Sequence, residues 1–171
     1  GQRSHAIETG IMLHRKIDAL TDSNPVNKDI KALMPSYTHR YCGILIDMVF
    51  DHFLSMHWQQ HSQQTLADFS QLTYQTLASF ESTMPSHCAV FFSRMVEYDL
   101  LCQYHDWQMV EQVLQRIARR LKNPQGLIDC IAPLTHIKND IEPLILATYP
   151  QIVRQVNDIR VQLSDNSSSL K

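Results

Sequence analysis

One stretch of the chain, residues 44–58, constrains the fold more than any other: ILIDMVFDHFLSMHW. Its apolar residues recur at helical spacing, which predicts a single helix. Asp47 and Asp51 are four residues apart, so they project from the same face of that helix, one turn apart. His52 follows directly, about 100° further round. Carboxylates among so many apolar residues lose hydration, and a cation shared with a second helix would offset that loss.

Residues 11–20, IMLHRKIDAL, predict such a second helix. His14 and Asp18 are four residues apart, and Ile7 and Ile11 continue the same stripe upstream. The polar pair therefore lies in line with residues expected in the core. Packed together, the two helices would offer carboxylate and imidazole ligands to a metal ion.

Length and composition favour one all-α domain. The 171 residues include only 4 glycines and no Asn-Gly or Asp-Gly pair, so hairpin signals are missing, while helical periodicity recurs from Ser4 to Leu163. We predict a single-domain helical bundle over residues 1–163 and a polar, disordered tail over 164–171. The net charge of -2 gives no basic field that would indicate a nucleic-acid partner. No apolar run of 18 residues indicates a membrane-spanning helix. The four cysteines form no C-x-x-C pair, and we interpret them as reduced residues of a cytoplasmic protein. The sequence does not indicate the oligomeric state.

Two motifs carry a resemblance to a known family. They are HRKIDALTDSNP, beginning at His14, and DMVFDHFLSMHW, beginning at Asp47. Together with YHDWQMVEQVLQRIARR and YPQIV, they are similar to the bacterial acyl carrier protein phosphodiesterases, also called acyl carrier protein hydrolases, over nearly the whole chain. The resemblance implies a helical fold distantly related to the HD-domain phosphohydrolases. It implies hydrolysis of the phosphodiester that joins 4′-phosphopantetheine to a serine of holo acyl carrier protein, with manganese as the usual ion.

The residues suit this chemistry. A divalent ion neutralises developing charge and lowers the pKa of a bound water. Asp and His ligands suit manganese, magnesium, iron or zinc. The predicted ligands include no Cys, which argues against a thiolate site. We assign His14, Asp18, Asp51 and His52 to the metal shell, and Asp47 and Asp51 to catalysis. Asp47 either orients a ligand histidine or acts as a base toward the attacking water.

Each assignment has a simpler alternative. His14 and Asp18 can form an ordinary i, i+4 pair that satisfies itself. A lone histidine such as His52 is more often a packed residue than a ligand. Asp47 and Asp51 are harder to explain without a cation, because like charges at this spacing repel each other.

Three basic residues, Arg15, Lys16 and Arg40, flank the predicted site. They would dock an acidic helix of the carrier protein, since complementary charge sets the rate and orientation of encounter. The alternative is a solvated face, the usual place of Lys and Arg.

Two other functions stay open: a non-catalytic helical module that binds a carrier protein, and an HD-like phosphohydrolase acting on a nucleotide, which needs no P-loop. The first residue is Gly, whereas family members usually begin with a short segment that holds a His and a GN-x-x-x-DF-like motif. We therefore expect an upstream segment to supply a further carboxylate. Without it, the chain should bind metal more weakly and release little 4′-phosphopantetheine.

Overall fold

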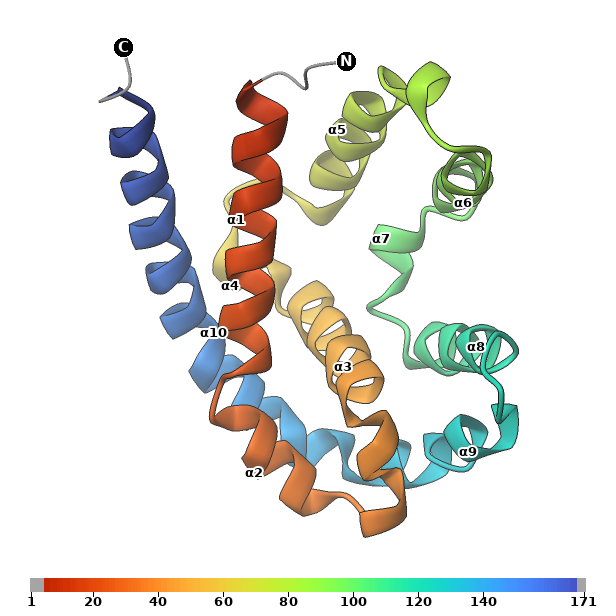
Figure 1. Ribbon diagram of the computed structural model, residues 1–171. Coiled ribbons are helices and arrows are strands. Elements are labelled where there is room, and N and C mark those ends of the chain that lie inside the picture. The colour runs from red at the N-terminus through yellow and green to blue at the C-terminus, as the bar shows by residue number, and fades with distance from the viewer. Residues whose placement is uncertain (1–4, 169–171) are drawn as a thin grey trace. The chain divides into compact units, whose positions relative to one another are not determined.

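In a computed structural model, which describes residues 5–168, all regular secondary structure is helical (Figure 1). The predicted all-α class is confirmed. No helix in this part of the chain is both long and apolar enough to cross a membrane. The α-helices are α1 His5–Asp22, α2 Val26–Leu33, α3 Cys42–Met56, α4 Trp58–His61, α5 Leu66–Ala78, α6 Ser86–Glu97, α7 Leu100–Gln103, α8 Trp107–Ala118, α9 Pro124–Ile128 and α10 Ile131–Ser168, with 3₁₀ helices η1 Ser36–Tyr41 and η2 Glu81–Thr83.

The described chain separates into two compact units. The first unit contains residues 5–43 and 133–168, and the second unit contains residues 44–132. The first unit therefore includes α1, α2 and most of α10, and the second includes most of α3 and all of α4–α9. As a result, His14 and Asp18 belong to the first unit, whereas Asp47, Asp51 and His52 belong to the second.

The turn between α1 and α2 follows local rules. The Asn24 side-chain oxygen accepts a hydrogen bond from the backbone N–H of Val26, at 3.0 Å. Pro25 stands at the helix start, where its missing N–H has no cost. Val26 and Ile30 are buried, so the amphipathic face of this short helix fixes how the chain turns.

Prolines inside a helix usually interrupt it, yet helix α10 continues through Pro143 and Pro150. Each proline removes a backbone donor and crowds the preceding turn. Burial of an aliphatic stripe along the same helix offsets that cost. The stripe consists of Ile141, Ile145 and Ile152.

The predicted start of the polar tail also differs from the structure. Helix α10 ends at Ser168, so the backbone of residues 164–168 is helical rather than disordered. Residues 169–171 of the predicted tail lie outside the described residues.

In the second unit, the helix predicted over residues 44–58 is present as α3, but its C-terminal end comes two residues earlier than predicted. Helix α3 stops at Met56, and His57, with φ -102° and ψ 19°, separates it from α4. Leu45, Val49 and Phe53 are buried along α3.

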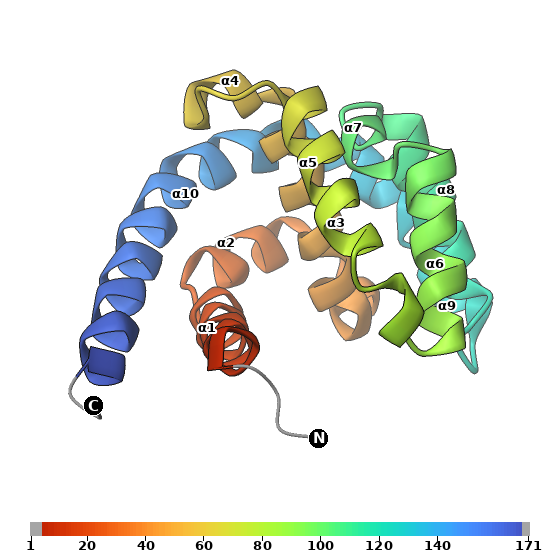
Figure 2. The same cartoon turned by 90° about the horizontal axis from the view of Figure 1, so that it is seen from above.

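Further along this unit, α7 contacts both α5 and α6, and α8 packs on α9 (Figures 1 and 2). Residues of α7 and of the C-terminal part of α3 line the same pocket.

Candidate active site

Helix α3 presents Asp51 at a small pocket in the second unit. The pocket has a volume of about 170 Å³. Its walls come from α3, α4, α5 and the α7 segment, and they are mostly apolar. The lining residues are Asp51, Leu54, Ser55, Trp58, Leu66, Phe69, Leu101 and Tyr104.

These surroundings change the acidity of Asp51. Burial by the surrounding protein, and next the charge of Asp47, raise the pKa of Asp51 from 3.8 to about 6. Asp51 is still exposed at the pocket mouth, so water screens part of this effect. Burial, and next the charge of Asp51, also raise the pKa of Tyr104. A carboxyl group with a pKa near neutrality can both take and give a proton.

The α7 wall of the pocket is held by two side-chain contacts. The Ser70 hydroxyl donates to the Asp99 carboxylate at 2.6 Å, and the backbone N–H of Leu101 donates to the Tyr74 hydroxyl at 3.1 Å. Asp99 adopts a left-handed backbone conformation, with φ 43°, at the start of α7. A non-glycine residue in this region is strained, and the surrounding contacts must hold it there. The wall is therefore fixed by the fold.

His52 is packed against the same wall. It is 3% exposed, and its Nδ1 lies 2.9 Å from the carbonyl oxygen of Tyr104. A carbonyl can only accept, so Nδ1 carries the proton. The ring also makes edge contacts with Phe53 and Trp107, at centroid distances of 4.9 and 5.0 Å. His52 therefore has a clear packing role, and this contact would also orient the ring of a metal ligand.

The predicted residues of the first unit are exposed. His14 Nε2 lies 3.4 Å from an Asp18 carboxylate oxygen, with side chains 75% and 54% exposed. This geometry is that of an ordinary helix-surface pair. The remaining predicted site residues are also exposed: Asp47 on α3, and Arg15, Lys16 and Arg40, of which Arg40 lies 6.0 Å from the Tyr41 ring.

Comparison with known proteins gives a family. A family model described as acyl carrier protein phosphodiesterase matches residues 1–152. The chain belongs to this family. A Yersinia pestis protein named acyl carrier protein phosphodiesterase is 28% identical over 91% of this chain and 81% of its own length. A protein of the same name from Serratia proteamaculans is 27% identical over 92% of this chain and 82% of its own length. Another from Escherichia coli O6:H1 is 26% identical over 88% of this chain and 79% of its own length. No solved structure matches the chain.

The metal ligands predicted for this phosphodiesterase-family chain fall into pairs. His14 and Asp18 are one turn apart on α1, and Asp51 and His52 are consecutive residues on α3. Within residues 5–168, no group of three or more His, Cys, Asp or Glu side chains is placed to hold an ion. The four-residue ligand set of His14, Asp18, Asp51 and His52 stays a prediction.

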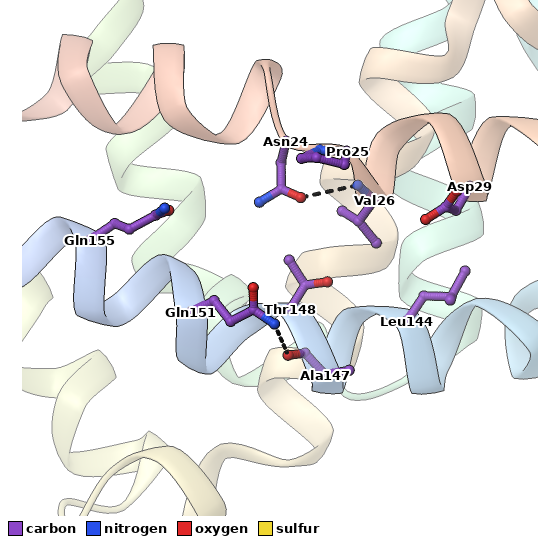
Figure 3. A pocket seen from close by; sticks show the side chains of 9 residues that line it. All are labelled: Asn24, Pro25, Val26, Asp29, Leu144, Ala147, Thr148, Gln151 and Gln155. Atoms are coloured by element: carbon purple, nitrogen blue, oxygen red, sulfur yellow. Dashed lines mark hydrogen bonds between the residues drawn. The ribbon is translucent and has the colours of Figure 1, made fainter.

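The first unit of this family member has a pocket of its own. Figure 3 shows side chains of the α1–α2 turn facing those of α10 across it. Its volume is about 410 Å³, and amide side chains dominate the polar lining, with Asp29 as its one charged residue. Asn24 and Gln151 each use one amide atom on a nearby backbone group, at 3.0 and 3.3 Å. The Asp51 pocket is the stronger candidate, because it holds a carboxyl group with a pKa near neutrality.

Sequence reasoning missed the walls of the Asp51 pocket. It assigned none of Trp58, Leu66, Phe69, Leu101 and Tyr104 to the site. One signal was available, because Tyr104 begins the YHDW segment that carries part of the family resemblance.

Proposed function

We propose that this protein hydrolyses the phosphodiester between 4′-phosphopantetheine and the serine of holo acyl carrier protein. Membership of the acyl carrier protein phosphodiesterase family supports this proposal. The structural observation that carries it is Asp51, a carboxyl group with a pKa of about 6 at the mouth of an apolar pocket. Such a group is suited to proton transfer near neutral pH.

The proposed reaction needs one proton acceptor and one proton donor. Water attacks phosphorus while the bond between phosphorus and the serine oxygen breaks. Asp51 takes a proton from the attacking water and returns it to the serine oxygen, which leaves as the hydroxyl of the apo carrier protein. The pantetheine arm leaves as its phosphate monoester, so atoms and charge balance. Asp47, one turn away, is the alternative proton acceptor.

A divalent cation belongs to this proposal. Two carboxylates beside an anionic phosphodiester repel each other and the substrate, and oxygen and imidazole donors without thiolates suit manganese, magnesium or iron. His14, Asp18, Asp51 and His52 would hold the ion. It would supply charge neutralisation at the phosphate. While Asp51 holds the ion, its carboxylate would not take up a proton, and Asp47 would then be the proton acceptor.

The first unit carries the proposed docking residues. Arg15, Lys16 and Arg40 are exposed, and the described chain records no ion pair for any of them. Exposed basic side chains attract an acidic surface and orient it during encounter. We propose that they meet an acidic helix of the carrier protein.

Release of the arm from holo carrier protein tests the function. The natural full-length protein is incubated with holo carrier protein and manganese, or with a chelator, and the carrier mass is followed by mass spectrometry. We expect conversion to apo carrier protein with manganese and a loss of activity with the chelator. Asp51→Asn should lower kcat/KM about 10²–10⁴-fold.

The matched control is Asp158→Asn, which removes an exposed carboxylate from α10, outside the pocket. It should retain the wild-type kcat/KM. Absence of conversion by the wild-type protein with manganese, or equal rates for Asp51→Asn and Asp158→Asn, would reject the proposed function.

A further inference from the structure

The apolar half of the Asp51 pocket has no task in the proton transfers described above. Five of its eight lining residues are apolar: Leu54, Trp58, Leu66, Phe69 and Leu101. Asp51 is the charged residue of the lining, and Ser55 and Tyr104 add hydroxyl groups. Water alone is a poor occupant of such a pocket, because it finds few hydrogen-bond partners there. The lining instead suits a compact apolar group that lies close to a polar reacting centre.

The volume of the pocket limits that group. Liquid water occupies about 30 Å³ per molecule, so about 170 Å³ accommodates only a few heavy atoms. Pockets for whole small molecules are about 300–1,000 Å³. The pocket is therefore too small for a nucleotide or for the whole pantetheine arm, but it is large enough for a branched group of four or five carbons.

The aromatic wall of the pocket is preformed. The Trp58 indole N–H donates to the Gln64 carbonyl oxygen at 2.7 Å, which fixes the ring without using a ligand. Phe69 lies against it, with ring centroids 4.7 Å apart and planes at 44°. Across the pocket, the Tyr74 hydroxyl holds the backbone of Leu101. A preformed apolar wall binds without first losing conformational entropy.

The pantetheine arm has one group of the matching shape at the matching place. Its phosphate ester oxygen is followed by a methylene and then by a quaternary carbon with two methyl groups. The rest of the arm, with a hydroxyl, two amides and a thiol, is extended and polar. We propose that the Asp51 pocket receives this gem-dimethyl group and so places the scissile phosphate beside Asp51, an inference that rests on the proposed function.

In this arrangement, the pocket sets specificity for the arm rather than for the carrier protein. A phosphodiester whose first carbons are unbranched leaves the apolar wall unfilled. Each buried methyl group contributes to binding, so loss of both should weaken binding about tenfold. The polar end of the arm makes no contribution to this difference.

Fluorescence of Trp58 gives a test that does not depend on turnover. The chain has two tryptophans, and Trp107→Phe leaves Trp58 as the single reporter. This protein is titrated with 4′-phosphopantetheine, with the same compound lacking both methyl groups, and with adenosine monophosphate. We expect the natural arm to change Trp58 fluorescence with a Kd about tenfold lower than that of the analogue, and no response to the nucleotide.

Two matched substitutions on α5 localise the effect. Both side chains are exposed. Phe69→Ala removes a wall of the pocket, whereas Leu72→Ala removes a side chain that does not line it. The affinity ratio between natural arm and analogue should fall to about twofold in Phe69→Ala and stay near tenfold in Leu72→Ala. Circular dichroism melting of both variants checks that they fold.

A third substitution fills the pocket instead of opening it. Ser55→Leu places extra carbon atoms in the lining and should reverse the preference, so that the analogue without methyl groups binds better than the natural arm. Equal affinities in the reporter protein, or a ratio unchanged by both Phe69→Ala and Ser55→Leu, would overturn the inference. If the titrations show the expected ratio but holo carrier protein is not hydrolysed, the proposed function alone is rejected.

Discussion

The two predicted halves of the metal site lie in contrasting surroundings. On α1, His14 and Asp18 form an exposed pair at 3.4 Å. On α3, His52 is 3% exposed and hydrogen-bonded to the Tyr104 carbonyl, and Asp51 has a pKa raised to about 6. The same residue types thus form a solvated pair in one unit and, in the other, a buried histidine next to a carboxyl group whose pKa is raised. Spacing indicates which side chains share a face, whereas the neighbouring elements decide what that face can do.

The largest expected effect concerns turnover at the perturbed half. Asp51→Ala should lower kcat/KM about 10²–10⁴-fold, because it removes the proposed proton carrier. His14→Ala, in the solvated half, should act only through metal binding, so saturating manganese should restore most of its activity. Rates over a manganese series check both. Rescue of Asp51→Ala by high manganese would reduce Asp51 to a ligand and shift the proton transfers to Asp47.

The second expected effect concerns stability at His52. His52→Ala should lower the free energy of unfolding by about 2–4 kcal/mol, because it leaves a cavity beside Trp107 and an unpaired Tyr104 carbonyl. His52→Phe retains the ring volume and should cost only the hydrogen bond, about 1–2 kcal/mol. Urea denaturation with a chelator present measures both values. Equal losses for the two variants would contradict the separation of packing from hydrogen bonding.

Local sequence signals were enough to predict the helices around these residues. Asn24 caps the start of α2, and the side chains of Thr65 and Asp106 accept hydrogen bonds from backbone N–H groups of α5 and α8, at 3.1 and 2.9 Å. These contacts join residues two or three positions apart, so their geometry follows from the turn itself. The same rules failed at Pro143 and Pro150, where burial over several turns outweighs a local cost.

The site was predicted less well than the helices. The spacing of Asp47 and Asp51 was enough to predict that Asp51 belongs to a site. The pocket beside Asp51, however, also needs Leu101 and Tyr104, which lie about fifty residues further along the chain. Such contacts are set by tertiary packing, which periodicity does not encode. His52 shows the same limit, since its partner is a backbone carbonyl that no side-chain motif reveals.

The third prediction uses the pKa of Asp51. Its folded-state pKa of about 6 lies above the ordinary 3.8, so the folded protein holds this proton more tightly than the unfolded chain. The resulting stability is fully present below about pH 3.8 and is lost as pH rises through about 6. Asp51→Asn should match the wild type near pH 4 and be more stable by about 1–2 kcal/mol at pH 7, after allowance for solvent screening. Urea denaturation over this pH range, with a chelator, measures the difference. A constant difference across the range would contradict the raised pKa.

The smallest expected effect concerns the solvated half. His14→Ala should change the free energy of unfolding by only about 0.3 kcal/mol in the presence of a chelator, because an exposed i, i+4 pair contributes little. With manganese, a ligand role predicts a larger effect, since an ion that binds only the folded state raises its stability. The melting temperature of the wild type should then rise with manganese, and that rise should be smaller in His14→Ala. Asp158→Asn is the matched control, because it also removes an exposed ionisable group from the first unit. An identical manganese-induced rise in wild type, His14→Ala and Asp158→Asn would leave His14 and Asp18 as an ordinary surface pair and confine the chemistry to α3.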